Sequence, residues 1–281
     1  MRQIPKSDDT KFRGPNMRIA IIGANGYVGV ALSSQLKSKK MHVMRISGSE
    51  FRKQLPHVRE MFKTADVVVN CAHPSFVTDN PLDNQIDYES LISDSLPSKA
   101  LNIFLSSSAV YSASSDACED SPTNSKSNYA ISKLSIEKHY LSCISNPIVF
   151  RMGQVYTNKP KPLTFFSDLI EASRKNGKSK LRNGGSRLSI LLDSTLCDAI
   201  LRVTYSNIGR VFNISSGLNM TTAELASSLI GFPSSCDISF ERFYEDGTWL
   251  NIERAKGSGL VTDVTNTSDI FFSRMRSQIQ E

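Results

Sequence analysis

Cysteine and histidine are scarce in this sequence, and their spacing shows no metal or disulfide pattern. The five cysteines lie far apart without a C-x-x-C pair, and the four histidines form no ligand motif. This excludes a disulfide-stapled scaffold and a zinc site of the usual spacing, and we expect no bound metal. No apolar run approaches the roughly 18 residues that a membrane-spanning helix requires, so we expect no membrane partner.

A large excess of one charge sign is also missing. The 281 residues include 33 Lys and Arg against 27 Asp and Glu, which gives a net charge of +6. Such a mild basic excess suits an anionic small molecule better than a nucleic acid, because no basic stripe is interleaved with aromatic side chains. With 40% hydrophobic residues, the chain has enough apolar material for one large or two unequal globular domains.

The first 16 residues are polar and lack the apolar core of a secretory signal. We therefore expect residues 1–16 to form a flexible leader and the fold to begin at Met17. Because neither a signal nor a membrane span is found, the sequence predicts a cytoplasmic location.

From Met17 onward, short apolar runs alternate with segments of helical spacing. Residues 18–23, 66–71 and 147–151 are apolar runs of strand length, whereas residues 129–144 have the length and spacing of a helix. This alternation is typical of βαβ units, in which helices cover both faces of a parallel sheet. The sequence therefore predicts an α/β fold with a doubly wound, Rossmann-like parallel sheet.

A glycine-rich turn, GANGYVG at residues 23–29, follows the first predicted strand and opens a helix. Gly23 allows the tight turn, Gly26 lets backbone N–H groups approach a pyrophosphate, and Gly29 allows close helix packing. The partial positive charge of the helix N-terminus would strengthen phosphate binding. This context favours a dinucleotide site over a glycine turn without a ligand.

The predicted second strand ends at Ser47 without the carboxylate that usually binds a ribose 2′-hydroxyl. Three cations, Arg45, Arg52 and Lys53, flank this position. Serine and arginine would accept a 2′-phosphate that a carboxylate would repel. The sequence therefore favours NADP(H) over NAD(H). Glu50 lies close enough to keep NAD(H) as an alternative, and the plainer interpretation is a solvated basic turn.

Tyr129 and Lys133, in the segment YAISK, are four residues apart on a predicted helix and therefore share one face. A nearby ammonium lowers the pKa of a tyrosine from about 10 toward the working pH, which makes its hydroxyl a general acid or base. A serine cluster at residues 106–108 ends a strand and would place a hydroxyl in the ligand-binding crevice of such a sheet. Taken alone, Tyr129 and Lys133 could be a surface pair on a helix, and the serine cluster could be a capped turn. The order of these motifs along the chain instead indicates one catalytic site.

Two long polar loops are predicted, at residues 112–128 and 176–186, and long loops in compact folds usually serve a site. The second loop and its flanks are strongly cationic. Six cations and no acid fall within residues 173–187, namely Arg174, Lys175, Lys178, Lys180, Arg182 and Arg187. A nucleotide diphosphate is a natural partner for such a segment, and a solvated cationic loop is the alternative for most of its members.

These motifs resemble those of the extended short-chain dehydrogenase/reductase superfamily, in its NAD-dependent epimerase/dehydratase branch. The matching stretches are GANGYVG at 23–29, DVVVNCA at 66–72, LSSSAVYS at 105–112, YAISK at 129–133, VFRMGQVY at 149–156 and GRVFNISSG at 209–217. Together with the weaker regularity beyond Gly153, the resemblance implies an NADP-binding Rossmann domain at residues 17–152. Residues 153–281 would mainly form a small C-terminal substrate-binding subdomain, with some segments returning to the sheet.

By this resemblance, Ser107, Tyr129 and Lys133 form the catalytic triad, with Ser106 and Ser108 as alternatives to Ser107. The implied cofactor-binding residues are Gly23, Asn25, Gly26, Tyr27, Val28, Gly29, Arg45, Ser47, Asn70, Cys71, Ala72, Tyr129 and Lys133. The implied substrate-binding residues are His73, Ser108, Gln154 and Arg187. The resemblance also suggests a homodimer formed through the long helices, one of which carries Tyr129.

Departures from the family narrow the expected activity. The dehydratases of the family carry Thr-Asp-Glu where this chain has Ser107-Ser108-Ala109, so the acidic pair for loss of water is missing. Epimerases of the family usually have an acidic residue at the position of Ser47 and a larger C-terminal domain. The shortened stretch between the second strand and DVVVN resembles the nucleotide-deoxysugar 4-ketoreductases.

We therefore expect an NADP(H)-dependent reductase of the 4-keto group of a nucleotide-activated deoxysugar. Tyr129 would donate the proton, Lys133 would tune it and hold the nicotinamide ribose, and Ser107 would orient the substrate oxygen. One alternative is a nucleotide-sugar 4-epimerase, in which the same triad oxidises and re-reduces C4 on a retained cofactor. The other is a non-catalytic NADP-sensing protein, because the fold alone does not set the function.

Overall fold

The computed structural model describes residues 17–72, 81–123, 126–158, 164–174, 177–203, 205–229, 236–262 and 264–280. The expected leader, residues 1–16, and the predicted substrate residue His73 lie outside these ranges. None of the helices within these ranges has both the length and the apolar content of a membrane span.

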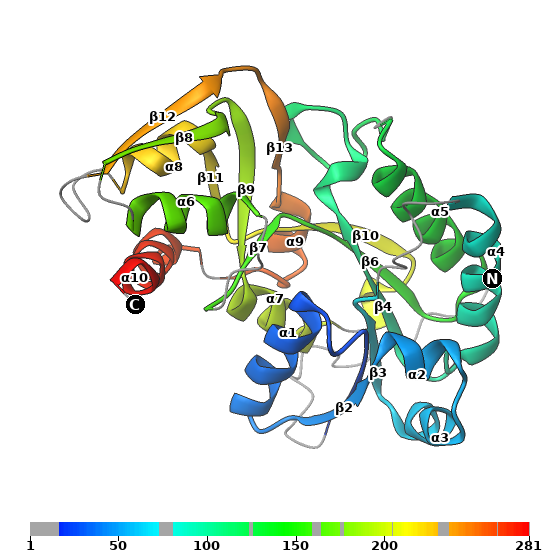
Figure 1. Cartoon of the computed structure of the whole chain (residues 1–281). Coiled ribbons are helices and arrows are strands. Elements are labelled where there is room, and N and C mark those ends of the chain that lie inside the picture. Colours follow the sequence, from blue (N-terminus) through cyan, green and yellow to red (C-terminus); the bar gives the residue numbers. More distant parts are fainter. Residues whose placement is uncertain are drawn as a thin grey trace.

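The main sheet has six parallel strands, as the alternation of apolar runs and helices predicts (Figure 1). In their order across the sheet, the strands are β10 (Arg210–Ile214), β6 (Pro147–Met152), β4 (Leu101–Ser107), β3 (Val67–Asn70), β1 (Arg18–Ile22) and β2 (His42–Ile46). The chain leaves β1 toward β2 and then crosses to β3 on the other side of β1, so the strand order reverses there. Ligands of doubly wound sheets bind at the carboxyl ends of the strands beside such a reversal.

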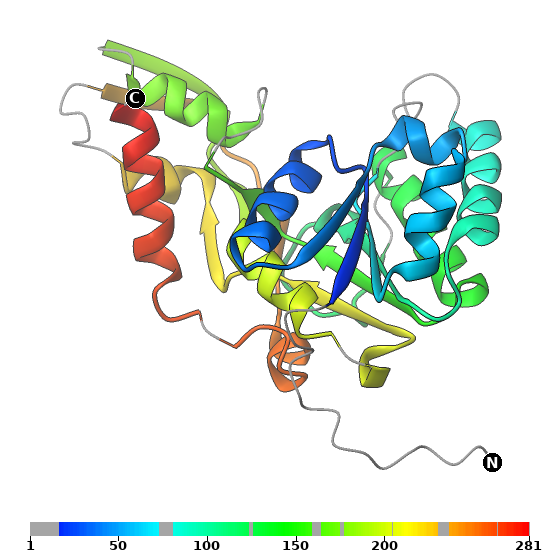
Figure 2. The same cartoon turned by 90° about the horizontal axis from the view of Figure 1, so that it is seen from below.

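The central strands are apolar on both faces because helices cover each face (Figure 2). In β1, Ile19 and Ile21 pack into one core and Ile22 into the other. The first core lies under α1 (Tyr27–Ser38) and α7 (Asp193–Leu201). The second core lies under α2 (Gly48–Arg52), α3 (Pro56–Thr64), α4 (Pro81–Ser95) and α5 (Asn128–Cys143). Burial on both sides explains why these strands are continuous apolar runs in the sequence.

Most of the chain after β6 builds a second layered part beside the main sheet (Figure 1). Its five-stranded sheet contains β11 (Leu218–Thr221), β9 (Ser186–Leu192), β13 (Asp246–Leu250) and β5 (Ser114–Ala117) in that order, with β7 (Gln154–Tyr156) also paired with β9. A separate pair of strands is formed by β8 (Gly177–Asn183) and β12 (Cys236–Arg242).

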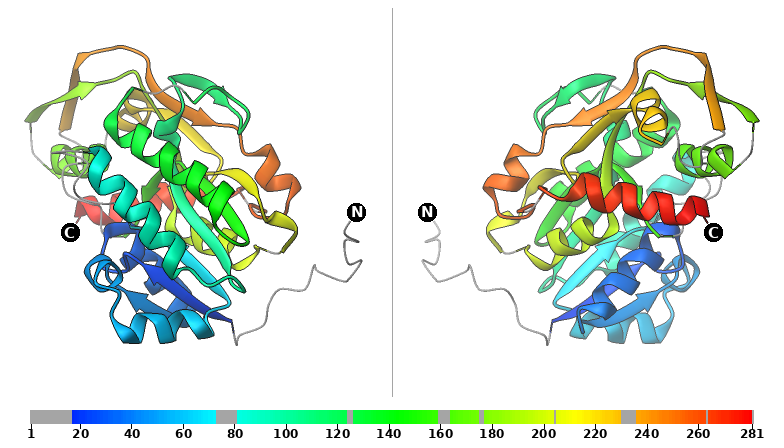
Figure 3. Two further views of the ribbon diagram at one scale, coloured as in Figure 1. Left: turned by 90° about the vertical axis from the view of Figure 1, so that its right-hand side faces the viewer. Right: turned by 90° about the vertical axis from the view of Figure 1, so that its left-hand side faces the viewer.

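A third core joins the helices of this part. It contains Tyr156, Phe166 and Phe271, whose rings pack edge to face. The helices that bury it are α6 (Phe165–Arg174), α8 (Thr222–Ser227) and α10 (Thr267–Gln280). Figure 3 (right) shows α10 lying across the outside of this part. Three later segments instead pack on the main sheet or at its edge, namely α7, β10 and α9 (Glu253–Gly257).

Both stretches predicted as loops contain strands, so that prediction is wrong for part of each. Within residues 176–186, β8 pairs in parallel with β12, and within residues 112–128, β5 pairs with β13. The β8 sequence GKSKLRN has one apolar residue, Leu181, so no local pattern marks it as a strand. Its partner, β12, comes from a distant part of the chain, so the pairing cannot be predicted from the local sequence pattern.

Candidate functional site

The glycine turn between β1 and α1 has the backbone geometry that the motif predicts. Gly23 has a φ of +79°, in the left-handed region that favours glycine. Its N–H and that of Ala24 donate to the Ile46 carbonyl at the end of β2, at 2.9 and 3.0 Å. A Cβ on Gly29 would overlap the Gly23 carbonyl, so glycine is needed for α1 to start this close to the turn.

The N-terminus of α1 borders a cleft at the carboxyl ends of the main strands. Gly26 is the N-cap, and the first turn has no acidic residue. The partial positive charge of the helix N-terminus is therefore not offset by a carboxylate in that turn. This glycine-turn cleft has a volume of about 480 Å³. Its lining residues are Gly23, Gly26, Tyr27, Val28, Gly48, Arg52, Cys71, Ala72, Leu105, Tyr129, Lys133 and Met152.

Five of the expected cofactor residues are absent from the lining found in the described ranges, namely Asn25, Gly29, Arg45, Ser47 and Asn70. Two of them shape the turn instead. The Arg45 guanidinium, through Nη2, donates to the Ala24 carbonyl at 2.9 Å and to the Asn25 Oδ1 at 3.1 Å. Arg45 therefore braces the glycine turn from β2 rather than facing the cleft.

Ser47 is the N-cap of α2, and Glu50 completes a capping box with it. The Ser47 N–H donates to the Glu50 carboxylate at 2.7 Å, and the Glu50 N–H donates to the Ser47 Oγ at 3.1 Å. Hydrogen bonds from Ser47 lower the pKa of Glu50. In the described ranges, two cations line the cleft, Lys133 and Arg52, and the Arg52 Nη1 lies over Gly48. The sequence analysis named Arg52 as a flanking cation, but the capping box at the start of α2 was not predicted.

Asn70 is fully buried and fixes the end of β3 from inside. Its Oδ1 accepts the Ala72 N–H at 3.0 Å and the Tyr88 hydroxyl at 3.2 Å, while its Nδ2 donates to the Tyr140 hydroxyl at 2.9 Å. This network holds Cys71 and Ala72 at the cleft. Ala72 in turn lies directly against the glycine turn, within 2.9 Å of where a Gly23 Cβ would lie.

Ser107, Tyr129 and Lys133, the predicted triad, come together between the end of β4 and the start of α5. Ser127 caps α5 with its side chain, and Tyr129 lies in the first turn. Tyr129 hydrogen-bonds with Ser107, and the Lys133 Nζ lies 5.9 Å from the centre of the tyrosine ring. The buried Lys133 ammonium donates to the Leu105 carbonyl at 2.8 Å.

The serine cluster divides into three roles. Ser107 is hydrogen-bonded with Tyr129. Ser106 is buried and donates to Glu137. Ser108 begins a single turn of 3₁₀ helix, η2 (Ser108–Val110), and lines a second cavity. This geometry favours Ser107 over the two alternatives.

Burial shifts the pKa values of the tyrosine and the lysine in opposite directions. Exclusion of water raises the pKa of Tyr129, and the hydrogen bond with Ser107 only partly offsets this. The expectation that Lys133 lowers this pKa below its usual value is therefore wrong for the structure. Burial lowers the pKa of Lys133 to about 8, although Cys71 and Glu137 act to raise it. Tyr129 thus keeps its proton at neutral pH, as a proton donor must.

The second cavity, of about 980 Å³, opens beside the first and is named here the β9–β13 cavity. Tyr129 lines both of them. The residues around the β9–β13 cavity are Ser107, Ser108, Ala109, Tyr111, Ser112, Ala113, Lys126, Ser127, Tyr129, Gln154, Ser186, Arg187, Leu188, Asp246, Gly247 and Thr248. Three of the four expected substrate residues, Ser108, Gln154 and Arg187, therefore meet here.

Arg187 is the most buried cation of the β9–β13 cavity. Its guanidinium pairs with Glu245 and lies 5.7 Å from the centre of the Trp249 ring. The two partners differ in exposure, with 13% of the arginine side chain and 78% of the glutamate side chain accessible. Lys126 and Asp246 also line the cavity. Neither was predicted. Asp246 lies on β13, which meets β9 by long-range strand pairing, and Lys126 lies just before α5, and no motif marks either residue.

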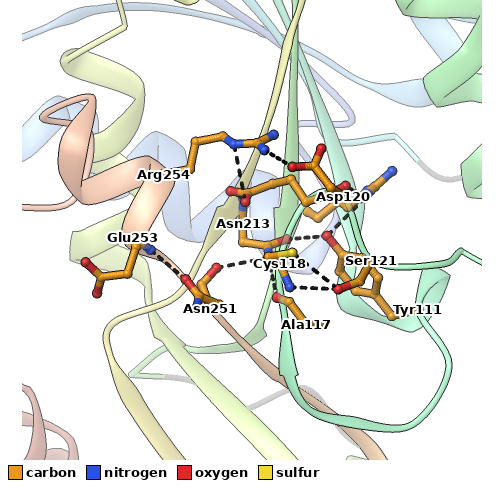
Figure 4. A network of polar contacts seen from close by, with 11 residues as sticks. Tyr111, Ala117, Cys118, Asp120, Ser121, Asn213, Asn251, Glu253 and Arg254 are labelled. Carbon is orange, nitrogen blue, oxygen red and sulfur yellow. Dashed lines mark hydrogen bonds and ion pairs between the residues drawn. The ribbon is translucent and has the colours of Figure 1, made fainter.

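A buried polar layer supports Tyr111 behind this cavity (Figure 4). The Tyr111 hydroxyl donates to the Asn213 Oδ1 at 2.7 Å and accepts from the Arg151 guanidinium at 3.0 Å. Asn213, on β10, donates to the carbonyls of Ala117 and Asn251 at 2.7 and 3.0 Å. The layer therefore ties the segment after β4 to β10 and to the chain before α9.

The sequence matches one protein-family model, described as the NAD-dependent epimerase/dehydratase family, over residues 19–215. No curated protein sequence matches the chain significantly.

Solved structures of similar fold include three nicotinamide complexes. A dTDP-glucose 4,6-dehydratase from Bacillus anthracis with NAD is 18% identical, with a TM-score of 0.76 over 94% of this chain and 96% of that chain. A UDP-glucuronic acid 4-epimerase from Bacillus cereus with UDP-glucuronic acid and NAD is 20% identical, with a TM-score of 0.73 over 94% and 99%. The protein RMD from Pseudomonas aeruginosa with NADPH is 17% identical, with a TM-score of 0.73 over 94% and 98%. At these identities, the likeness shows a shared fold.

Proposed function

Because the chain belongs to the NAD-dependent epimerase/dehydratase family, we propose that this nicotinamide-dependent enzyme reduces the 4-keto group of a nucleotide-activated deoxysugar with NADP(H). One observation carries the proposal: Tyr129 lines both cavities and hydrogen-bonds with Ser107. A hydroxyl at this junction can reach a nicotinamide on one side and a sugar carbonyl on the other. Its raised pKa keeps it protonated before the reaction.

The glycine-turn cleft fits a nicotinamide dinucleotide. The amide groups around Gly26 would hold the pyrophosphate, Ala72 would pack beside it, and Lys133 would reach the nicotinamide ribose. When bound, the nicotinamide supplies the hydride. We assign residues 17–152 apart from β5, together with α7 and β10, to this half of the enzyme, and β5 with most of residues 153–281 to the substrate half.

The preference for NADP(H) is supported by Arg52. Its guanidinium lines the cleft next to Gly48, where it would pair with a 2′-phosphate. The nearest carboxylate, Glu50, is already engaged by Ser47 and by His57, whose Nε2 lies 3.4 Å away. A carboxylate that binds the ribose 2′-hydroxyl would favour NAD(H). Because Glu50 is engaged by Ser47 and His57, it is less available for that contact.

The β9–β13 cavity would take the nucleotide sugar. Arg187 and Lys126 provide cations for a diphosphate. The residues after Ser107 are Ser108 and Ala109, without the acidic pair that elimination of water requires. Among the cavity residues in the described ranges, the one carboxylate is Asp246 on β13. This lining supports reduction rather than dehydration.

In the proposed reaction, a C–H bond forms at the carbonyl carbon as hydride arrives. The Tyr129 hydroxyl breaks its O–H bond and gives the proton to the carbonyl oxygen, so the ketone becomes an alcohol. Ser107 would hold that oxygen by a hydrogen bond. The Lys133 ammonium, near the tyrosine ring, would stabilise the phenolate that is left.

A nucleotide-sugar 4-epimerase is the second candidate, and Glu50 is the observation that favours it. Its carboxylate accepts the Ser47 N–H at the end of β2, near the place where a ribose-binding acid occurs in NAD enzymes. An epimerase would use the same triad in both directions and would return its cofactor unchanged.

The test is NADPH oxidation by the purified protein with a panel of nucleotide 4-keto-6-deoxysugars, followed by identification of the product. We expect net oxidation that falls about 10²–10⁴-fold in Tyr129→Phe, with NADPH binding retained. Tyr205→Phe is the matched control, because this tyrosine is exposed at the surface and contacts the Lys99 carbonyl.

Two outcomes contradict the proposal. Interconversion of sugars at C4 without net NADPH loss would identify the epimerase. Binding of NADPH without turnover of any carbonyl, together with no effect of Tyr129→Phe, would leave the cofactor-sensing alternative.

A further inference from the structure

Helix α5 carries a third functional group beyond Tyr129 and Lys133, and like the lysine it is buried. Tyr129, Lys133 and Glu137 follow one another at intervals of four residues and therefore share one face. Lys133 and Glu137 are 4% and 2% exposed. A buried carboxylate is costly unless it is hydrogen-bonded and paired, so its partners indicate what it does.

Glu137 is clamped to two strands of the main sheet. From β6, the Arg151 guanidinium donates through Nη2 at 2.8 Å and through Nε at 3.2 Å. From β4, the Ser106 hydroxyl donates to the other side of the carboxylate. Ser106 directly precedes Ser107, so the clamp fixes α5 to the strand that carries the triad serine.

Glu137 lies one helical turn beyond Lys133, and its charge acts to raise the pKa of the buried Lys133 ammonium. The other titratable or polar groups around Lys133 are the Cys71 thiol at the end of β3, the Tyr129 phenol on α5 and the Leu105 carbonyl on β4. The Phe104 ring lies 4.8 Å from the ammonium. Glu137 contributes the carboxylate among these groups, and the Arg151 guanidinium pairs with that carboxylate from β6.

We propose, on the basis of the function proposed above, that Glu137 is a positioning residue for the reaction. Its clamped carboxylate holds α5 against β4 and β6, and it keeps Lys133 positively charged beside Tyr129 when the enzyme works. Tyr129 and Ser107 carry out the chemistry, and Glu137 acts through Lys133.

The direction of the effect on pH follows from the charges. Burial lowers the pKa of Lys133 to about 8, and the Glu137 carboxylate opposes this lowering. Replacing Glu137 by a neutral residue lowers the pKa of Lys133 further. The ammonium then loses its proton at a lower pH, and activity that depends on it declines earlier on the alkaline side.

The test compares Glu137→Gln, which keeps the shape of the side chain, with the wild-type protein. We expect the alkaline limb of the kcat profile to move down by about half to one pH unit, with KM for the sugar little changed. Glu137→Asp keeps the charge, so it should restore the position of the limb even where kcat falls. An unchanged limb in Glu137→Gln overturns the proposal.

Glu119→Gln is the matched control, because it removes another buried carboxylate from the same polar layer. Glu119 accepts the Asn213 N–H at 2.8 Å and pairs with Arg254 at 3.5 Å. Asn213 and Arg254 are labelled in Figure 4. It does not contribute to the charge around Lys133. Glu119→Gln should lower the stability of the protein without moving the alkaline limb. If Glu119→Gln moved the limb as far as Glu137→Gln does, the role of Glu137 would be structural only.

A second readout needs neither cofactor nor turnover. In protein labelled at lysine Cε, the NMR resonance of Lys133, identified by its loss in Lys133→Met, should titrate near pH 8 in the wild type and lower in Glu137→Gln. A midpoint below neutrality in the wild type overturns the proposal even if Glu137→Gln does not fold. If no sugar is reduced but Lys133 titrates as expected, the proposed function fails while the control of Lys133 by Glu137 stands.

Discussion

Arg187 and Glu245 form an ion pair whose two members differ sharply in burial. The arginine is held in the β9–β13 cavity against Trp249, while the glutamate is mostly in solvent. An anionic substrate group that binds Arg187 must therefore displace Glu245, which costs the energy of a partly exposed ion pair.

Glu245→Gln should consequently lower KM for the nucleotide sugar by about two- to fivefold, with kcat unchanged. Steady-state kinetics at low ionic strength measure this. Glu241→Gln, an exposed acid on β12, is the control and should leave KM unchanged. A rise in KM for Glu245→Gln would mean that Glu245 organises Arg187 for the substrate rather than competing for it.

Arg52 gives a second prediction, on cofactor choice. Arg52→Ala should raise KM for NADPH about tenfold, because a charge-assisted hydrogen bond to the 2′-phosphate is lost, and should leave KM for NADH nearly unchanged. Lys53→Ala, at the exposed neighbouring position, is the control. Equal effects on both cofactors would show that Arg52 does not read the 2′-phosphate.

At the scale of elements, the turn between β1 and α1 depends on close backbone approach. Gly29→Ala would force its Cβ into the Gly23 carbonyl and the Ala24 backbone, which we expect to destabilise the fold by about 1–3 kcal/mol and to weaken NADPH binding. Gly257→Ala, in α9, meets no atom within 4 Å and should be neutral or slightly stabilising. Thermal unfolding and cofactor titration of both variants check this, and equal melting temperatures would contradict it.

The elements that the sequence predicts well are those with a strong local pattern. Strands β1, β3 and β6 are continuous apolar runs because both of their faces are buried, and the glycine turn and YAISK have fixed spacing. The polar strands β5 and β8 were predicted as loops, because they are stabilised by pairing with β13 and β12 rather than by their own side chains.

The site divides in the same way. The motifs predicted Gly26, Tyr129 and Lys133 at one cleft, and the structure brings them together there. Asp246 and Lys126 were missed because the strand and loop that carry them have no motif. The raised pKa of Tyr129 was also missed, since it depends on how much water the folded protein excludes rather than on the spacing to Lys133.

At the scale of the whole molecule, the main sheet is completed from both halves of the chain. β10 pairs with β6 along its whole length and buries Phe212 against Phe150. A fragment of residues 17–152 should therefore fail to fold cooperatively, because it exposes a strand edge and one end of a core. Circular dichroism and size-exclusion chromatography check this against the full chain. A cooperative melt of the fragment would show that the sheet is stable without β10.

The late arrival of β10 also affects how the protein is made. The ribosome finishes β6 at Met152 well before it starts β10 at Arg210, an interval of roughly 3–12 s at about 5–20 residues per second. Throughout that interval, the nascent chain presents an unpaired strand edge next to apolar side chains, which is the kind of surface that chaperones bind. Synonymous codons that slow translation between the two strands would lengthen this exposure, and would thereby lower the yield of folded enzyme without changing any residue.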